Sequence, residues 1–174
     1  MFQLQFPEDE IEHWASRWQE TKYVPKQAAA LAAGNNLASG RFTREEFEMV
    51  CGWKSERRLD LLRNNQQEVI EEAVGIAKKV KDSGLAIAVL TGLSGVQAGM
   101  GSALLTAMKP MCHTVIDFRA LHALGVIRDP SSYLRLYPAY LNECRSLRDR
   151  LKVDLRKLDN ALWAWSLHQP PPRI

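Results

Sequence analysis

One stretch of the chain combines a glycine turn, a small-residue helix and a carboxylate. It runs from Leu93 to Asp117 and reads LSGVQAGMGSALLTAMKPMCHTVID. A turn at Gly95 followed by a helix start leaves several backbone N–H groups pointing outward. With the positive end of the helix dipole, these donors form a natural phosphate site. A carboxylate placed beside a sugar can activate water or stabilise a growing positive charge. Asp117 is the candidate for that chemistry.

Asp117 has a second interpretation that needs no chemistry. The residue directly precedes FRALHALG, a helical sequence, and aspartate is one of the preferred N-cap residues. A buried cap and a catalytic acid look the same in sequence, and one side chain can serve as both. The sequence leaves both roles of Asp117 open.

Two helices are expected to carry the glycine turn. Residues 85–93 are apolar enough to form a buried helix that ends at Ser94–Gly95. A second helix is expected from Gln97 to Met108, and its small residues let another helix or a ligand approach closely. These small residues are Gly99, Gly101, Ser102, Ala103 and Ala107.

The rest of the chain also shows helical periodicity, with apolar residues at three- and four-residue steps. Pro138 lies inside one such stripe and is expected to kink or interrupt its helix. The stripes are Val69, Ala73, Ile76, Ala77 and Val80; Tyr133, Tyr137, Tyr140, Leu141, Cys144, Leu147 and Leu151; and Leu155, Leu158, Leu162 and Trp165.

Local start and stop signals place several helix ends. Thr43 is expected to cap a helix, with the glutamate three residues later completing a capping box. The sequence PKQAAALAAGNNLASG favours a helix from about Pro25 that fades at Gly34 or Gly40. Further ends are expected at Ser83–Gly84 and Gly125, and a start or turn at Asp129–Pro130.

No run alternates with period two, so no sheet is predicted. We expect a single compact all-α domain over residues 1–174, built from about eight to ten short helices. The final residues, QPPPRI, are expected to be extended and frayed.

The composition is that of a soluble globular protein. Of the 174 residues, 46% are hydrophobic and 25% are charged, which excludes disordered and membrane-embedded classes. The formal net charge of +3 permits a nucleic-acid partner without requiring one. The longest apolar run, residues 85–90, is too short to span a bilayer, so no membrane partner is predicted.

The cysteine and histidine patterns predict no metal and no cofactor. Cys51, Cys112 and Cys144 form no C-x-x-C pair, which argues against zinc and iron–sulfur sites, and the four histidines show no ligand spacing. Reduced, mostly buried thiols and the lack of a signal peptide over residues 1–10 together predict a cytoplasmic protein.

The hairpin and its spacing resemble the helix-hairpin-helix DNA glycosylase superfamily. Members carry a hairpin of the form L-P-G-V-G and an essential aspartate, at the same distance from its first glycine as the 22 residues between Gly95 and Asp117. The match covers residues 90–125. It is looser over CGWKSERRLDLLRNNQQEV and DLRKLDNALWAW, which are similar to small bacterial proteins of 8-oxoguanine glycosylase-like fold. The resemblance implies a helix-hairpin-helix DNA-repair protein that binds double-stranded DNA.

Two residues depart from the family pattern. Gln97 replaces the second hairpin glycine, so the turn or its phosphate contact is expected to differ. Gly99 stands where bifunctional members place a Schiff-base lysine, which implies a monofunctional reaction that uses Asp117 and water. The resemblance also places DNA contacts at Gly95, Val96 and the two departing residues.

Other residues have both a functional and a structural interpretation. Trp53 could stack on a base or pack in the core, and Lys54 could contact phosphate, replace the missing nucleophile or extend into solvent. Arg119 could contact DNA or pair with Asp117. Asp159 is expected to pair with a base near the hairpin. Lys109 and Arg128 on one side of the hairpin, and Lys78, Lys79 and Lys81 on the other, could add salt-dependent affinity.

Three functions therefore stand after the sequence alone. The first is a monofunctional DNA glycosylase that cuts the glycosidic bond of a flipped damaged or modified base. The second is a non-catalytic helix-hairpin-helix DNA-binding protein. The third is a partner protein whose Tyr- and Trp-rich C-terminal helices form an interface. Neither the lesion nor the oligomeric state follows from the sequence.

Overall fold

The computed structural model describes residues 2–41 and 43–170. Within these ranges every regular element is a helix and no strand occurs, which confirms the all-α prediction. None of these helices is both long and apolar enough to cross a bilayer. The α-helices are α1 (Ile11–Gln19), α2 (Val24–Ser39), α3 (Arg44–Ser55), α4 (Leu59–Leu62), α5 (Gln67–Lys79), α6 (Ser83–Thr91), α7 (Ala98–Met108), α8 (Phe118–Ala123), α9 (Tyr133–Leu151) and α10 (Leu155–Leu167), with short 3₁₀ turns η1 (Glu8–Glu10), η2 (Glu56–Arg58) and η3 (Pro130–Ser132).

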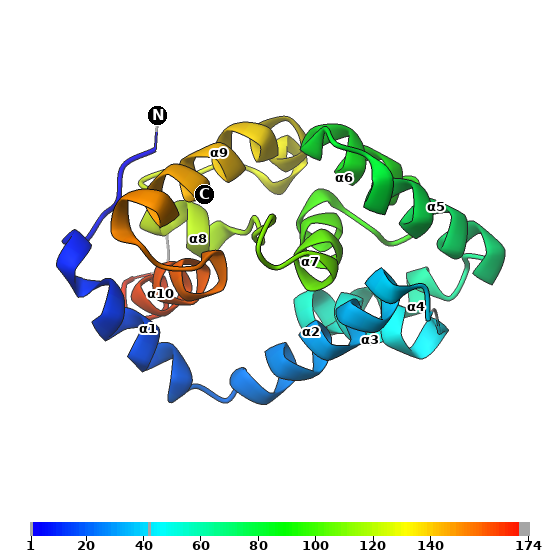
Figure 1. Cartoon of the computed structure of the whole chain (residues 1–174), viewed down its shortest axis with the longest axis horizontal. Helices are drawn as coiled ribbons and strands as arrows, with labels where there is room; N and C mark the ends of the chain where they lie inside the picture. Colours follow the sequence, from blue (N-terminus) through cyan, green and yellow to red (C-terminus); the bar gives the residue numbers. More distant parts are fainter. Residues whose placement is uncertain (1, 42, 171–174) are drawn as a thin grey trace.

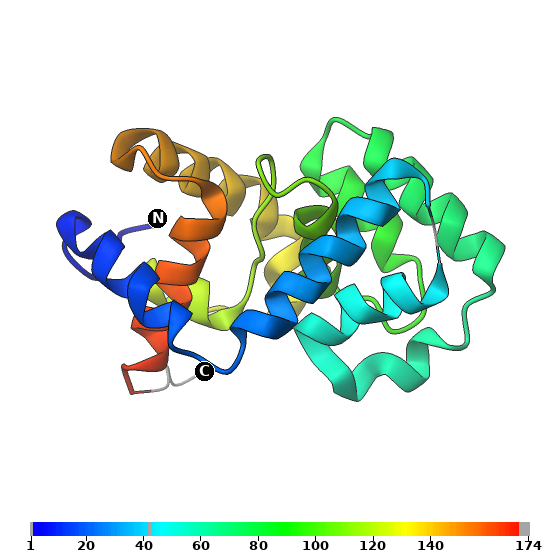
Figure 2. The same ribbon diagram turned by 60° about the horizontal axis from the view of Figure 1, so that its bottom comes forward.

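The helices form two groups. Helices α1, α8 and α10 pack together on one side, and α2 to α6 surround α7 on the other (Figure 1). Helix α9 bridges the groups, because it packs against both α10 and α6. The segments 20–23 and 109–117 cross between the groups, as the rotated view shows (Figure 2). A ligand site between the groups can therefore take residues from distant parts of the chain.

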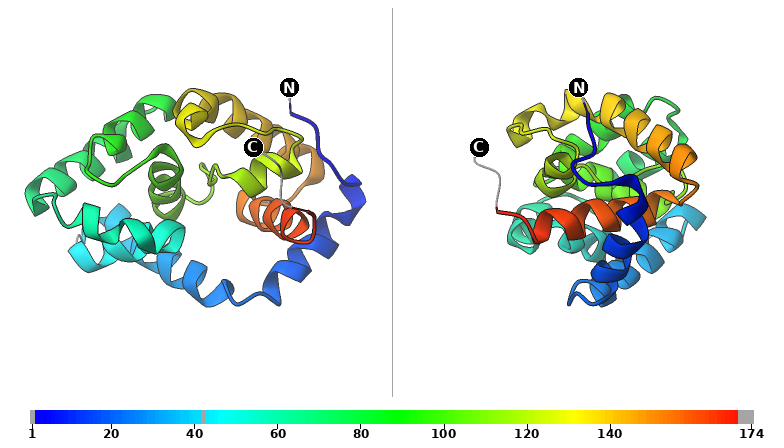
Figure 3. Two further views of the ribbon diagram at one scale, coloured as in Figure 1. Left: turned by 180° about the vertical axis from the view of Figure 1, so that it is seen from behind. Right: turned by 90° about the vertical axis from the view of Figure 1, so that its left-hand side faces the viewer.

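The N-terminal segment closes one side of the first group. The amides of Gln3 and Gln5 donate to the carbonyls of Leu124 and Ala123 at the end of α8, at 2.9 Å each. Figure 3 shows this segment running beside α8. Gly125, at φ +68°, ends the helix there, which confirms the predicted helix end.

The aromatic stripe of α9 is buried and holds the segment that leads to Asp117. The hydroxyl of Tyr137 donates to the Thr114 carbonyl at 3.2 Å, and that of Tyr140 donates to the Val115 carbonyl at 2.8 Å. Both tyrosine side chains are fully buried. The two tyrosines therefore hold the segment that leads to Asp117 in place. Because both side chains are buried, they cannot contribute to the protein–protein interface of the third hypothesis.

Helices α6 and α7 are packed together and joined by a turn at Gly95, and this α6–turn–α7 unit is called the hairpin below. Gly95 has φ +83°, which a residue with a side chain rarely adopts. The side chain of Asn65 clamps the turn, because its Nδ2 donates to the Ser94 carbonyl at 2.9 Å and its Oδ1 accepts from the Ser94 amide at 2.8 Å. The turn geometry is thus fixed by a contact that lies outside the hairpin.

Helix α2 approaches α7 closely at one glycine. A Cβ atom on Gly34 would lie 2.3 Å from the carbonyl carbon of Ala107, well inside the distance that real Cβ contacts show. Gly34 lies inside helix α2, and the helix ends at Gly40, which has φ +85°. Of the two predicted ends, only the later one is correct.

Several local predictions were wrong. Ser83–Gly84 begins α6 rather than ending a helix, because Asp82 accepts a hydrogen bond from the Leu85 amide at 2.7 Å. Helix α6 also stops at Thr91, earlier than expected, and Leu85 is exposed. Helix α9 continues through Pro138, so the interruption that was one of the two predicted effects does not occur; the proline ring packs beside Gly84.

Helix α5 forms as predicted, but only part of the predicted stripe faces the core. Ala77 of that stripe is buried, together with Ile70 and Val74, whereas Val69 and Ile76 of the stripe are exposed. Two apolar stripes share this helix, and packing against α6 and α7 selects one of them. The capping box is also only half formed: Thr43 caps the Glu46 amide at 3.2 Å, but the Glu46 side chain bonds Asn36. The predicted tail beyond Pro170 lies outside the described residues.

Candidate active site

Asp117 is the N-cap of α8 and is at the same time paired with a lysine. Its Oδ1 accepts hydrogen bonds from the amides of Arg119 at 3.0 Å and Ala120 at 2.9 Å. Its Oδ2 accepts from the Nζ of Lys54 at 2.8 Å. The predicted cap is thus confirmed, and it uses only one carboxylate oxygen.

The surroundings of Asp117 keep its carboxylate ionised. Burial raises the pKa of Asp117, but the charge of Lys54 and the three hydrogen bonds to the carboxylate outweigh it, and the pKa falls below its ordinary value. The Lys54 and Asp117 side chains remain 22% and 13% exposed. The pair is therefore accessible at its outer edge while most of the carboxylate is shielded from water.

The pair borders a hollow with aromatic walls. The hollow has a volume of about 230 Å³ and lies where α1, α8 and α10 meet α2, α3 and α7. Ala103 of α7, which is buried, has the smallest side chain among the described residues of the lining. Flat aromatic walls are suited to stacking on a planar ring. These walls are Trp18, Tyr23, Trp53, Phe118 and Trp163.

A polar network closes the inner side of the hollow. Asp159 accepts from the Nη2 of Arg156 at 2.5 Å and from the Thr114 hydroxyl at 3.1 Å. Arg156 also donates to the Oε1 of Gln27 at 3.3 Å, and Gln27 lines the hollow together with Asp159. Burial raises the pKa of Asp159, partly offset by the charge of Arg156. An amide and a carboxylate therefore face the space between the aromatic rings.

The partner of Asp159 differs from the prediction. A base near the hairpin was expected, but Arg156 lies one turn earlier on the same helix, α10. The same guanidinium lies 5.6 Å from the centre of the Trp53 ring. This contact joins α10 to α3 beside the hollow and helps to fix one of its walls.

A second hollow lies on the other side of the Lys54–Asp117 pair. It has a volume of about 260 Å³ and shares Lys54, Asp117 and Phe118 with the first. Gln97 and Gly99 of the hairpin line it. Its rim also carries Arg57 and Arg58, and neither forms an ion pair within the described part of the chain. The hairpin turn and a positive rim thus lie next to the carboxylate.

The structure brings only part of the predicted site together. Gln97, Gly99, Lys54 and Asp117 share the second hollow. Val96 is 5% exposed and belongs to the core, and Gly95 packs against Leu61, so their side-chain positions face inward rather than toward a ligand.

Arg119 does not pair with the carboxylate of Asp117. Its guanidinium lies 4.9 Å from the ring centres of both Phe118 and Trp163, and its Nη1 donates to the Ser166 carbonyl at 3.2 Å. It still lines the aromatic hollow, with its charge placed over the wall. Lys54 occupies the ion-pairing role that the sequence offered to Arg119.

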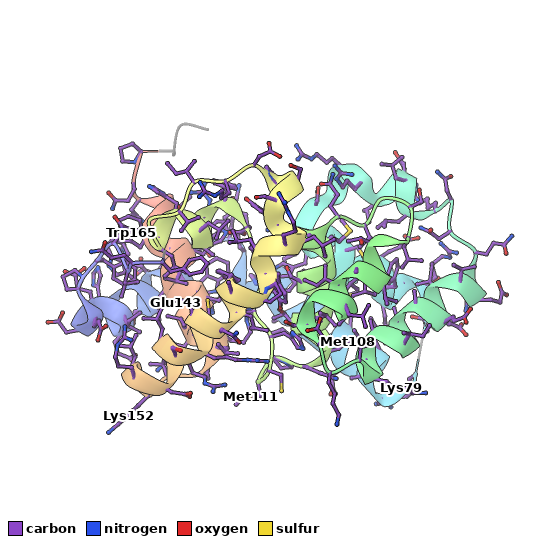
Figure 4. The ribbon with its side chains drawn as sticks, turned by 90° about the horizontal axis from the view of Figure 1, so that it is seen from above. Lys79, Met108, Met111, Glu143, Lys152 and Trp165 are labelled. Atoms are coloured by element: carbon purple, nitrogen blue, oxygen red, sulfur yellow. The ribbon has the colours of Figure 1, made fainter. Side chains whose placement is uncertain are left out.

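Lys109 lies away from the site. It follows the C-terminal end of α7, opposite the end that begins after Gln97, and its Nζ donates to the Lys78 carbonyl at 2.5 Å. In Figure 4 the neighbouring Met108 and Lys79 lie in the same lower half of the molecule. Lys78 in turn donates to the Ala38 carbonyl, so both amines hold helices together.

The sequence missed most of the walls. Trp18 and Tyr23 lie at the junction of α1 and α2, and Gln27 lies in the first turns of α2. Trp163 of α10 also lines the hollow, and of these walls only Trp53 was among the predicted site residues. The sequence did contain a signal for the cationic rim of the second hollow, because Arg57 and Arg58 come shortly after Trp53–Lys54.

No group of three or more His, Cys, Asp or Glu side chains in residues 2–41 and 43–170 is arranged to hold a metal ion. Cys51 and Cys144 are buried, Cys112 is exposed, and all three are free thiols.

No family model, curated protein or solved structure matches the chain. The geometry of the site is therefore the basis for a functional proposal.

Proposed function

We propose that the protein is a helix-hairpin-helix DNA glycosylase-like enzyme that excises a flipped base. The observation that carries the proposal is the position of Asp117. Its ionised carboxylate lies at the border of an aromatic-walled hollow and beside the α6–α7 hairpin. A base held in this hollow would place its sugar close to the carboxylate of Asp117.

The hollow supplies what a flipped base needs. Stacking on aromatic rings offsets part of the cost of taking a base out of the duplex. Gln27 and Asp159 offer amide and carboxylate groups to the edge of the base. The carboxylate of Asp117 would then stabilise positive charge on the sugar or activate water as the glycosidic bond breaks.

The hairpin and the rim supply a grip on the DNA backbone. The side chain of Gln97, the N-cap residue of α7, forms no capping hydrogen bond with the amides of the first turn. These backbone donors are therefore available to a phosphate. Arg57 and Arg58 stand next to them on the rim of the second hollow. Cationic side chains of this kind position a duplex and make its binding salt-dependent.

The test is a panel of duplexes that carry different damaged or modified bases. Wild type and Asp117→Asn are incubated with each duplex, and hot alkali then reveals abasic sites as strand breaks. We expect wild type to produce alkali-dependent breaks in at least one duplex and Asp117→Asn to produce none above background. Equal cleavage by both proteins would contradict the role of Asp117, and absence of DNA binding at low salt would contradict the proposal as a whole.

One observation favours a second candidate, a non-catalytic DNA-binding protein. Both oxygens of Asp117 are engaged, one by α8 amides and one by Lys54, as in a purely structural acid. The panel separates the candidates, because this second function predicts retardation of DNA by both proteins with no base release from any duplex.

A further inference from the structure

We propose that the second hollow is a phosphomonoester site, and that the two hollows together take a nucleoside 5′-monophosphate, either free or at the 5′ end of a DNA strand. The inference rests on the proposed function for the place of the base and the sugar. It goes beyond that function because it gives the second hollow a ligand of its own, a terminal phosphate rather than the backbone of a continuous strand.

The first support is the positive charge on the rim of the second hollow. Arg57 and Arg58 of η2 lie on this rim, and neither forms an ion pair within the described part of the chain. A phosphodiester carries a single negative charge, whereas a phosphomonoester carries about −1.5 to −2 at neutral pH. Two unpaired guanidinium groups therefore match the charge of a monoester better than that of a diester.

The second support is a buried hydroxyl without a partner. Tyr133, the first residue of α9, lines the second hollow and is only 5% exposed. Its hydroxyl forms no hydrogen bond within residues 2–41 and 43–170, in contrast to the hydroxyls of Tyr137 and Tyr140 on the same helix. Burial, with the charges of Asp117 and Asp129, raises the pKa of Tyr133 to about 12, so the hydroxyl keeps its proton. Since buried polar groups are nearly always hydrogen-bonded, an acceptor oxygen in this hollow would supply the missing partner.

The third support is the start of α7, a helix of eleven residues. Gly99 and Met100 of its first turn line the second hollow, and no side chain caps the amides of this turn. Such amides, with the positive end of the helix dipole, suit a phosphate. Donors for one phosphate thus come from three elements, η2, α7 and α9. The terminal phosphate has three free oxygens to meet them, whereas a phosphodiester has two and its strand must leave the site on both sides.

The two hollows are joined in the way that a nucleotide requires. They share Lys54, Asp117 and Phe118. A base stacked in the aromatic hollow would place its sugar at this shared border, and the 5′-phosphate of the same nucleotide would extend into the second hollow. The order of base, sugar and phosphate therefore follows the order of aromatic walls, carboxylate and cationic rim.

The test measures dissociation constants by isothermal titration calorimetry at about pH 8, where a phosphomonoester is a dianion and its methyl ester a monoanion. The ligands are 2-deoxyribose 5-phosphate, which probes the phosphate site without a base, and the common 2′-deoxynucleoside 5′-monophosphates. Each is compared with its methyl phosphate ester and with the same compound lacking phosphate. We expect each monoester to bind about tenfold or more tightly than either matched compound, because charged hydrogen bonds are lost in both comparisons.

A second arm distinguishes a free nucleotide from a DNA end. It uses a duplex with a single-stranded 5′ overhang, either phosphorylated at that end or carrying a 5′-hydroxyl. Tighter binding of the phosphorylated duplex alone would support the site and assign it to DNA ends. A preference confined to the small monoesters would support the site and assign it to free nucleotides.

Three variants remove one donor each. Arg57→Gln and Arg58→Gln are each expected to weaken binding of the monoesters by about tenfold, and Tyr133→Phe by about threefold, without weakening binding of the compounds that lack phosphate. Arg63→Gln is the matched control and is expected to bind every ligand as the wild type does, because Arg63 pairs with Asp60 on the surface. Tyr133→Phe breaks no hydrogen bond within the described chain, so it tests the site even where an arginine variant fails to fold. Thermal unfolding verifies that each variant is folded.

The outcomes separate this inference from the proposed function. No preference for a terminal phosphate in either arm would overturn the inference, as would a preference that persists unchanged in the folded variants. Base release from a damaged duplex without such a preference would overturn the inference and leave the glycosylase proposal standing. A preference for a terminal phosphate without base release from any damaged duplex would support the inference and count against base excision.

Discussion

Gly34→Ala is expected to lower the free energy of unfolding by about 3 kcal/mol or more. The added Cβ would meet the backbone of Ala107 at 2.3 Å, and backbone atoms cannot move aside by changing a rotamer. Relief requires α2 and α7 to separate, and these helices carry Gln27 and Ala103 of the aromatic hollow. Urea unfolding followed by circular dichroism measures the change.

Gly75→Ala is the matched control for this prediction. Gly75 also lies inside a helix, α5, but a Cβ atom there would meet nothing within 4 Å. Alanine has the higher helix propensity, so the same substitution is expected to raise the free energy of unfolding by roughly 0.5–1 kcal/mol. Equal effects at the two positions would show that α2 and α7 are not in close contact at Gly34.

Asp117→Asn is expected to lower the single-turnover rate of base release by about 10²- to 10⁴-fold, the range typical of a lost catalytic acid or base. The experiment uses whichever duplex the wild type processes. Asparagine is as good an N-cap as aspartate, so α8 is expected to keep its start. If the rate changes by less than about tenfold, the residue acts as a cap and the catalytic assignment fails.

Asp117→Ala completes the comparison by removing the cap as well. Loss of a capping side chain costs about 0.5–2 kcal/mol, so this variant is expected to be less stable than Asp117→Asn at neutral pH.

The free energy of unfolding of the wild type is also expected to depend on pH in the acid range. The pKa of Asp117 is lowered by folding, so its contribution to stability is present above the ordinary pKa of aspartate and is lost as the pH falls through the lowered one. Neither variant is expected to show that contribution.

Features fixed by neighbouring residues were the ones that the sequence predicted best. Thr43 and Asp117 begin helices because each side chain reaches an amide two or three residues ahead. The tyrosine stripe of α9 was also predicted correctly, since a single face of that helix is apolar. Ser83–Gly84 was assigned wrongly because the preceding Asp82 can cap a helix start, a signal that outweighs glycine as a stop.

The site could be predicted only in part because its contacts are long-range. Lys54 and Asp117 are 63 positions apart, and no local pattern announces their ion pair. The aromatic walls come from distant parts of the chain, and the sequence around each tryptophan is equally compatible with a core position. Lys109 was assigned to the site from its nearness in sequence, but an eleven-residue helix separates it from the hairpin turn. Packing of the two helix groups, rather than local sequence, decides which side chains meet.

The most direct test of the proposed function is a crystal structure of Asp117→Asn bound to a duplex that carries the processed base. We expect the damaged nucleotide to lie outside the duplex, with its base between the aromatic walls, its C1′ facing position 117, and a phosphate at the start of α7. A base that remains stacked in the duplex while the hollow stays empty, or DNA bound to another face of the molecule, would contradict it.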